Sequence, residues 1–176
     1  MAVAAVRDRR PADLDALAAA LVEVHRADGY PVEGVAEPRT WLTPPGTLRA
    51  WVATLDDAVV GHALAMTAQP AIAAVEAWAQ LGGDVATTVV GARLFVAPAG
   101  RGHHLGTRLA RTLTDWATRH ALDVVGDVMV KDTVAIAIYE RLGWHRIGSA
   151  MHDTGRGDRV PAHLYASRLI TAGQYA

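Results

Sequence analysis

The sequence contains no cysteine in its 176 residues. This absence excludes disulfide bridges, thiolate nucleophiles and cysteine-based metal sites. Lysine is nearly absent as well, because Lys131 is the only lysine among the 17 basic residues and all the others are arginines. Such arginine usage, together with abundant alanine, is typical of a GC-rich bacterial coding sequence.

Long apolar runs are also missing. No uninterrupted apolar stretch approaches the roughly 18 residues that are needed to span a bilayer. At the N-terminus an apolar run (1–6) precedes the charged residues 7–10, which is the reverse of the order in a signal peptide. We therefore expect a soluble, cytoplasmic protein with no membrane partner.

The charges nearly cancel, with 17 basic and 18 acidic residues and a formal net charge of -1. Such a chain offers no broad positive field for a phosphate backbone, which argues against nucleic acid as a partner. The composition, 51% hydrophobic and 20% charged, is that of a folded chain rather than a disordered one. The length suits a single domain over residues 1–176.

Hydrophobic periodicity and turn residues predict alternating strands and helices. Strands are expected at 2–6, 48–55, 58–66, 85–96, 122–130, 144–152 and 160–169, and helices at about 11–27, 70–81, 105–117 and 133–142. Asp56-Asp57 reads as the tight turn of a hairpin. This order predicts an α/β (α+β) fold, a mixed sheet with helices on its faces.

A glycine-containing turn between a strand and a long helix is the most informative segment. It runs from Pro98 to Gly106, and glycine there allows the backbone to approach a ligand closely. The first amides of a helix lack internal partners and can bind an anion. Two interpretations stay open: a phosphate cradle, or a turn that only closes a tight corner. His103 and His104 would add positive charge if protonated.

A second segment, Asp132 to Trp144, carries the pattern Ala-x-x-x-Tyr-Glu-x-Leu-Gly-aromatic about 30 residues later. Together the two segments resemble the GCN5-related N-acetyltransferase (GNAT) family, in this order along nearly the whole chain. Arg101 and Gly106 fit the outer positions of the pyrophosphate motif of that family, whereas His104 replaces its inner glycine. Asp132 replaces the usual asparagine and Trp144 the usual phenylalanine. Asp132 is also expected to cap the following helix.

The resemblance implies a single domain with a mostly antiparallel central sheet flanked by helices on both faces. It implies acetyl-CoA (coenzyme A) as co-substrate, no metal, and a strand whose backbone pairs with the pantetheine arm. The residues that the resemblance assigns to cofactor binding are Leu94, Phe95, Val96, Arg101, Gly102, His103, His104, Leu105, Gly106, Thr107 and Asp132. For 94–96 a buried strand is the alternative, and both can hold together.

Tyr139 is the candidate general acid, because a phenol with a pKa near 10 stays protonated at neutral pH and can protonate a departing thiolate. The alternative is a tyrosine that only packs a helix against the sheet. The eight histidines show no metal-binding spacing, since His103 and His104 are sequence neighbours that point in different directions.

In some members of the family that this sequence resembles, a glutamate on the strand before the glycine turn acts as general base. That strand contains no glutamate here, so the general base is harder to assign. Candidates are Glu33, His62, Glu76 and His152, each of which is an ordinary surface or packing residue in the alternative interpretation. A water chain or a neutral substrate would need no dedicated base. Two segments, 28–41 and 71–84, lie where the family builds its acceptor groove. The candidate substrate-binding residues are Tyr30, Glu33, Trp41, Glu76 and His152.

Two functions remain open from the sequence. The first is an N-acetyltransferase that transfers acetyl from acetyl-CoA to the primary amine of a small molecule. The second is a catalytically silent acyl-CoA-binding sensor or sequestering module. Tyr139 favours the enzyme, whereas His104 and the missing strand glutamate leave room for the sensor. Exposed terminal strands would allow a homodimer.

Overall fold

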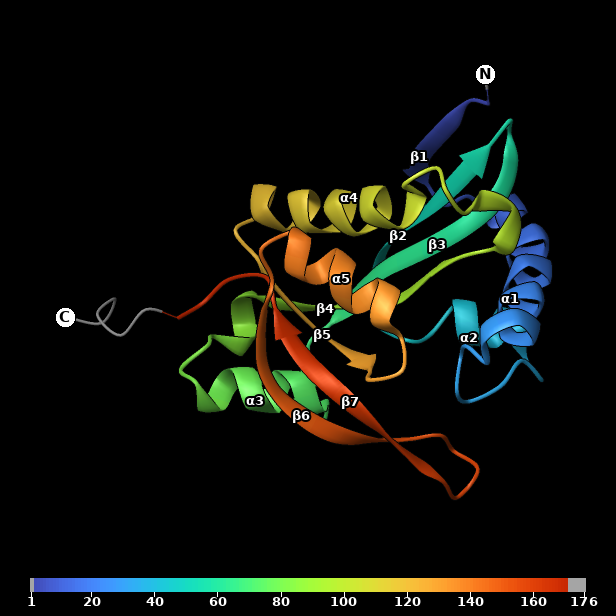
Figure 1. Cartoon of the computed structure of the whole chain (residues 1–176). Coiled ribbons are helices and arrows are strands. Elements are labelled where there is room, and N and C mark those ends of the chain that lie inside the picture. The colour runs from blue at the N-terminus through green and yellow to red at the C-terminus, as the bar shows by residue number, and fades with distance from the viewer. Residues whose placement is uncertain (1, 171–176) are drawn as a thin grey trace.

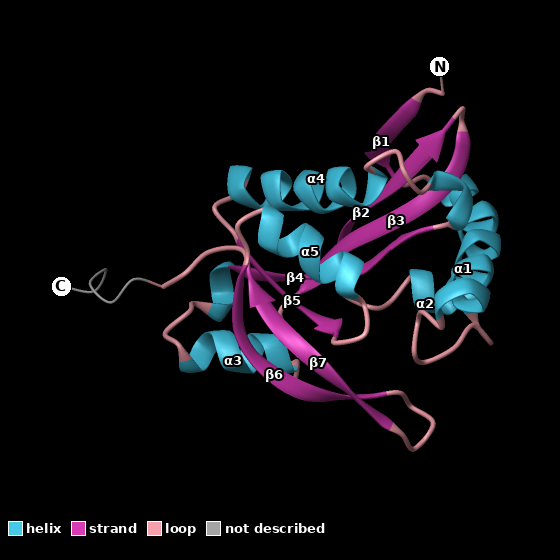
Figure 2. Ribbon diagram, in the orientation of Figure 1, coloured by secondary structure: helices cyan, strands magenta, loops and turns pink. Residues whose placement is uncertain are grey.

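The computed structural model describes residues 2–170, which form one seven-stranded sheet covered by helices (Figures 1 and 2). The strands are β1 (Ala4–Asp8), β2 (Thr47–Leu55), β3 (Ala58–Thr67), β4 (Thr88–Val96), β5 (Asp123–Met129), β6 (His145–Asp153) and β7 (Arg159–Ala166). The α-helices are α1 (Leu14–Asp28), α2 (Pro38–Leu42), α3 (Ala73–Gln80), α4 (Leu105–Arg119) and α5 (Thr133–Arg141). Short 3-10 helices lie at Pro11–Asp13, Val85–Thr87 and Pro98–Gly100.

The strand order is β1-β2-β3-β4-β5-β7-β6. Every neighbouring pair is antiparallel except β4 and β5, which are parallel. The predicted fold class, a mixed and mostly antiparallel sheet with helices, is therefore confirmed.

The β2–β3 hairpin forms where the sequence predicts it. Asp56 and Asp57 both adopt positive φ, at 47° and 65°, as the two central residues of a tight hairpin turn require. Asp56 also accepts the N–H of Val3 at 2.8 Å through its carboxylate. The turn residues thus fix the register of β2 against β3 and help to place β1 beside them.

Helices cover both faces of the sheet, each over its own apolar cluster (Figure 1). Helices α4 and α5 pack on one face; α1 and α3 pack on the other, with α2 against α1. The apolar positions of α4 recur at helical spacing and all lie inside: Leu105, Leu109, Ala110, Leu113, Trp116 and Ala117. None of the helices within residues 2–170 has the length and apolar character that a membrane crossing requires.

The strand predicted at 85–96 starts later than expected. Asp84 accepts the N–H of Ala86 at 2.9 Å through its side chain, and this contact turns residues 85–87 into a 3-10 helix. Asp competes with extended structure in this way because its short carboxylate reaches nearby amides. β4 consequently begins at Thr88.

β4 and β5 separate soon after they meet, which creates the main opening in the sheet. They pair only from Thr88 to Val90, opposite residues 123–125. Beyond that point β4 carries a bulge, where its register with β3 shifts and Arg93 adopts a φ of 58°. A bulge bends its strand and increases the local twist. The edge of β4 from 91 to 96 is therefore left without a β5 partner.

Candidate active site

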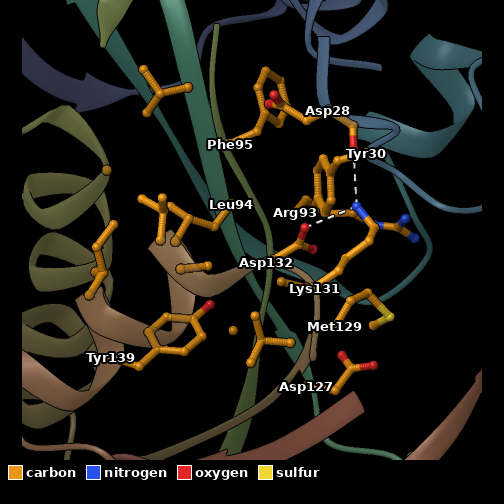
Figure 3. A pocket seen from close by; sticks show the side chains of 18 of the residues that line it. Asp28, Tyr30, Arg93, Leu94, Phe95, Asp127, Met129, Lys131, Asp132 and Tyr139 are labelled. Carbon is orange, nitrogen blue, oxygen red and sulfur yellow. Dashed lines mark hydrogen bonds and ion pairs between the residues drawn. The ribbon is translucent and has the colours of Figure 1, made fainter. Parts of the chain in front are cut away.

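A cleft of about 1280 Å³ begins where β4 and β5 part. Its walls come from β4, β5, α5, the starts of α3 and α4, the loop between α1 and α2, and the outer half of β6. Figure 3 shows Tyr139 entering it from the α5 side, with Asp28 and Tyr30 on the opposite side. The volume exceeds the 300–1000 Å³ or so that is typical of a pocket for one small ligand.

The free edge of β4 forms one wall of the cleft through Leu94, Phe95 and Val96. Their side chains alternate between the two cores, since Leu94 and Val96 pack under α4 whereas Phe95 packs under α1. The two interpretations of this strand, a buried strand and a strand whose backbone can pair with a ligand, are therefore compatible. The side chains are part of the core, and the backbone edge is open to an extended ligand that can pair with it.

The turn before α4 presents a run of unused backbone donors. Among residues 2–170 nothing accepts a hydrogen bond from the backbone N–H groups of 102–107. Gly102 and His104 adopt φ of 81° and 56°, which bends the chain around these amides. Consecutive free amides at the positive end of a helix dipole form an anion-binding concavity. Of the two interpretations left open by the sequence, the phosphate cradle is the one this geometry suits.

His104 occupies a backbone conformation that favours glycine. Its φ of 56° and ψ of 19° place it in the left-handed region, and its imidazole makes no cap hydrogen bond. The histidine bears a steric cost that glycine would avoid.

We predict that His104→Gly raises the free energy of unfolding by about 0.5–1 kcal/mol, since glycine adopts the left-handed region without a Cβ clash. Urea unfolding of the two proteins measures the difference. A loss of stability in the variant would instead mean that the imidazole makes contacts worth more than the strain.

Tyr139 lies on α5 with 7% of its surface exposed. Its ring stacks on Trp144 with centroids 4.6 Å apart and an interplanar angle of 7°. Trp144 is held in turn by a hydrogen bond from its indole N–H to the Thr114 hydroxyl on α4, at 3.3 Å. The packing interpretation of Tyr139 is thus correct for its ring. Its hydroxyl is the part that remains available for chemistry.

The hydroxyl of Tyr139 is directed into the cleft (Figure 3) and has no hydrogen-bond partner among residues 2–170. Burial, with a smaller contribution from the nearby Asp127 carboxylate, raises the pKa of this phenol well above its ordinary value. The group therefore stays protonated at neutral pH. A protonated, unpartnered hydroxyl is free to donate to a ligand in the cleft.

Asp132 does not cap α5 with its side chain, contrary to the expectation from the sequence. It stands at the N-cap position, but its carboxylate binds the ammonium of Lys131 at 3.0 Å. That ammonium also donates to the carbonyl of Asp28 at 3.1 Å, so it links the ends of β5 and α1 (Figure 3). The salt bridge takes the carboxylate away from the helix amides. Asp132 still lines the cleft.

Three charged side chains from distant segments meet at the other end of the cleft. His152 on β6 lies 2.9 Å from a carboxylate oxygen of Glu33 through Nε2, and 2.9 Å from one of Asp127 through Nδ1. These two hydrogen bonds raise the pKa of His152 to about 10. Burial opposes ionisation of Glu33, yet its bond to His152 leaves the pKa of Glu33 below its usual value. The cluster is an imidazolium held between two carboxylates.

The charge of His152 predicts a pH dependence of stability. A histidine whose pKa is raised on folding stabilises the native state as long as it is protonated there. For His152 this contribution is complete below the unfolded pKa of about 6.5 and is lost as the pH rises through the folded pKa of about 10. We expect the free energy of unfolding to fall by about 1–2 kcal/mol between pH 7 and pH 10.5 because of this group. Urea unfolding at both pH values measures it, with His152→Gln as the control that lacks the decline.

Aromatic side chains line the same end of the cleft. Tyr30 and Trp41 meet edge to face with centroids 5.7 Å apart. The guanidinium of Arg93 lies over the Trp41 ring, with Cζ 4.2 Å from the centroid. Tyr30, Glu33, Trp41 and His152, four of the five candidate substrate residues, therefore come together, although they lie far apart in sequence.

A sequence model described as the acetyltransferase (GNAT) family matches residues 15–144, which is more than half of the chain. The chain belongs to the GNAT family. None of the curated proteins searched matches it.

Solved GNAT structures share the fold over nearly their whole length. A GCN5-related N-acetyltransferase from Kribbella flavida is 26% identical, with 95% of this chain and 98% of that chain covered and a TM-score of 0.68. Arabidopsis thaliana NAA60 in complex with acetyl-CoA is 16% identical, with 96% and 100% covered and a TM-score of 0.70. The putative acetyltransferase yncA from Salmonella typhimurium with its cofactor acetyl-CoA is 16% identical, with 99% of each chain covered and a TM-score of 0.67.

Three candidates named from the sequence lie away from the cleft of this GNAT domain. Glu76 is exposed on α3 and accepts a hydrogen bond from Gln80 at 3.3 Å. The side chain of His103 is exposed and does not line the cleft, although its backbone N–H belongs to the run of free amides before α4. His62 is 0% exposed, and burial lowers its pKa to about 3. Glu76 and His62 are therefore unsuited as bases, and Glu76 is also removed from the acceptor groove.

Two residues at the end of the cleft that holds His152 were not predicted, namely Asp127 and Arg93. Each had a signal in the sequence, because Asp127 is the one acid inside the apolar stretch 124–130 and Arg93 interrupts the strand-forming run 85–96. A charge inside a buried strand is costly unless it has a partner or a function. Within residues 2–170, no group of three or more His, Asp or Glu side chains is arranged to hold a metal ion.

Proposed function

We propose that this GNAT protein transfers the acetyl group of acetyl-CoA to the primary amine of a small molecule, with Tyr139 as general acid. The observation that carries the proposal is the meeting of three features in one cleft. They are the unpaired edge of β4, the free amides of 102–107 and the unpartnered hydroxyl of Tyr139. Acetyl-CoA needs a hydrogen-bonding edge for its pantetheine, donors for its pyrophosphate and an acid for its sulfur.

The fit to acetyl-CoA can be described residue by residue. Backbone groups of Leu94 and Val96 face the opening and would pair with the amides of the pantetheine arm. The amides of 102–107 would bind the pyrophosphate. When bound, acetyl-CoA supplies an activated acyl group as a thioester. The two aligned binding features would hold that thioester beside the amine, which converts a bimolecular reaction into a nearly unimolecular one.

The chemistry assigned to this chain is proton transfer. As the amine nitrogen replaces sulfur on the acetyl carbon, the hydroxyl of Tyr139 would donate its proton to the departing thiolate. The phenolate would then recover a proton from the new amide nitrogen through water. Glu33 and Asp127 line the cleft and would attract an ammonium, whose proton would pass to solvent through water without a dedicated base. His152 already holds a proton at neutral pH, so it is not the base.

Calorimetric titration with acetyl-CoA and coenzyme A, followed by thiol release with a panel of small primary amines, tests the proposal. We expect binding of both cofactor forms and release of thiol that depends on the amine. Binding with no release from any amine would indicate the sensor or sequestering module instead. Absence of binding would rule out both functions.

A further inference from the structure

Arg93 lies at the bulge of β4, where a buried histidine contacts its backbone. Its carbonyl oxygen accepts a hydrogen bond at 3.0 Å from Nδ1 of the buried His62. The other ring nitrogen, Nε2, lies 3.1 Å from a guanidinium nitrogen of Arg9, which can only donate, so the proton of His62 is on Nδ1. His62 therefore holds the backbone of Arg93 in place through this hydrogen bond. We assign to this buried histidine the role of positioning Arg93.

The guanidinium of Arg93 is half-buried in the cleft wall, stacked on Trp41, yet within residues 2–170 it donates no hydrogen bond and forms no ion pair. Burial lowers its pKa. Other arginines whose guanidinium groups lack such partners, such as Arg111, are exposed to water. A half-buried guanidinium loses part of its hydration, and its unused N–H donors gain no hydrogen bonds in return. Hydrogen bonds to an anionic ligand would offset this loss.

The anionic partner is not supplied by the neighbouring carboxylates. Glu33 and Asp127 lie close enough to Arg93 to influence its charge, but both direct carboxylate oxygens to His152. The cleft therefore contains two charged groups of opposite sign. One is the pair Glu33 and Asp127, bridged by His152, and the other is the guanidinium of Arg93, whose N–H donors have no acceptor among residues 2–170. The amides of 102–107 suit the pyrophosphate of the cofactor, and they lie beyond the C-terminal end of β4. Arg93 is therefore not needed for the pyrophosphate and can bind the acceptor.

We propose that Arg93 binds a carboxylate of the acceptor, so that the acceptor is an amine of the amino-acid class. The planar fork of a guanidinium matches the two oxygens of a carboxylate. Glu33 and Asp127 attract the ammonium of the same molecule. The proposal rests on the proposed function, since it names the class of acceptor for the same cleft.

Matched pairs of acceptors test the proposal. Thiol release from acetyl-CoA is measured with the common L-amino acids and with ω-amino acids of about three to six carbons, each beside its carboxamide, which keeps the amine and removes the negative charge. We expect kcat/KM of the preferred acid to exceed that of its amide by about 10- to 100-fold, the range for a hydrogen bond to a charged group. Equal values for acid and amide would overturn the assignment of Arg93.

Two variants and a control separate the role of Arg93 from general damage. Arg93→Gln should lower kcat/KM for the acid by about 10- to 100-fold and leave the amide nearly unchanged, which abolishes the preference. Arg93→Lys keeps the positive charge but loses the planar pair of donors of the guanidinium. This variant should retain part of the preference for the acid over the amide. Arg111→Gln, on the exposed side of α4, should behave as wild type. Equal losses for acid and amide in Arg93→Gln would contradict the proposal.

Calorimetry of the same acids and amides on the protein saturated with coenzyme A distinguishes this inference from the proposed function. Tighter binding of the acid, lost in Arg93→Gln, supports the carboxylate site even if no thiol is released, in which case acetyl transfer is the part that fails. Thiol release with no preference between acid and amide supports acetyl transfer and rejects the carboxylate site.

Discussion

Tyr139→Phe is expected to lower kcat by about 100- to 1000-fold, within the range for loss of a general acid. The substitution removes only the hydroxyl, because a phenylalanine ring can keep the stack on Trp144 and the place of Tyr139 in the core. Affinity for acetyl-CoA should therefore stay nearly unchanged. Steady-state thiol release gives kcat, and calorimetric titration gives the Kd of the cofactor.

The control for this prediction is Tyr165→Phe. Tyr165 is buried beside Tyr139, with ring centroids 5.9 Å apart, but its hydroxyl donates to Glu140 at 3.0 Å and lies outside the cleft lining. It should keep the turnover of the wild type. An unchanged kcat in Tyr139→Phe would remove the acid role. A kcat reduced equally in both variants would point to a shared packing effect.

The pH profile gives a second readout for Tyr139. Because burial raises the pKa of its hydroxyl, ionisation of this group should cause no fall in kcat at moderately alkaline pH. An alkaline limb that disappears in Tyr139→Phe would show instead that the phenol ionises near its ordinary pKa. The environment assigned to its hydroxyl would then be wrong.

Gly106→Val is expected to raise the Kd for acetyl-CoA by about 5- to 150-fold. An added Cβ would lie 3.0 Å from Cδ1 of Ile138 on α5 and 3.7 Å from Cγ2 of Val96 on β4. Overpacking of this kind typically costs about 1–3 kcal/mol. The larger side chain would push α5 from α4 and crowd the free amides at the helix start. Calorimetric titration with acetyl-CoA measures the effect.

Gly148→Ala serves as the matched glycine control. A Cβ there would meet Leu164 at 3.5 Å and Ala77 at 3.9 Å, which are ordinary contacts, and Gly148 does not line the cleft. Cofactor affinity should be that of the wild type. If Gly106→Val also binds acetyl-CoA normally, the glycine turn serves only to start the helix and the phosphate cradle is wrong.

The end of the cleft that holds Glu33, Asp127 and His152 shows the limit of prediction from the sequence. Glu33 and His152 were each named as candidates, but nothing in the sequence pairs two residues that are 119 positions apart. Their contact depends on β6 lying next to β7 and on the loop after α1 reaching the far side of the cleft. Glu76, chosen by the same reasoning, points away because the apolar side of α3 faces the sheet and its polar side faces water.

The sequence by itself determined those features whose physical cause is local. Turn chemistry placed the Asp56-Asp57 hairpin and helical periodicity placed α4. The proposal of acetyl-CoA came from a different source, the resemblance of the glycine turn and of the segment around Tyr139 to the GNAT family. Tertiary structure alone decided the separation of β4 from β5, the cluster of Glu33, Asp127 and His152, and the stacking of a half-buried Arg93 on Trp41. These depend on strand order and on burial, which arise from contacts between distant segments and leave no periodic signal along the chain.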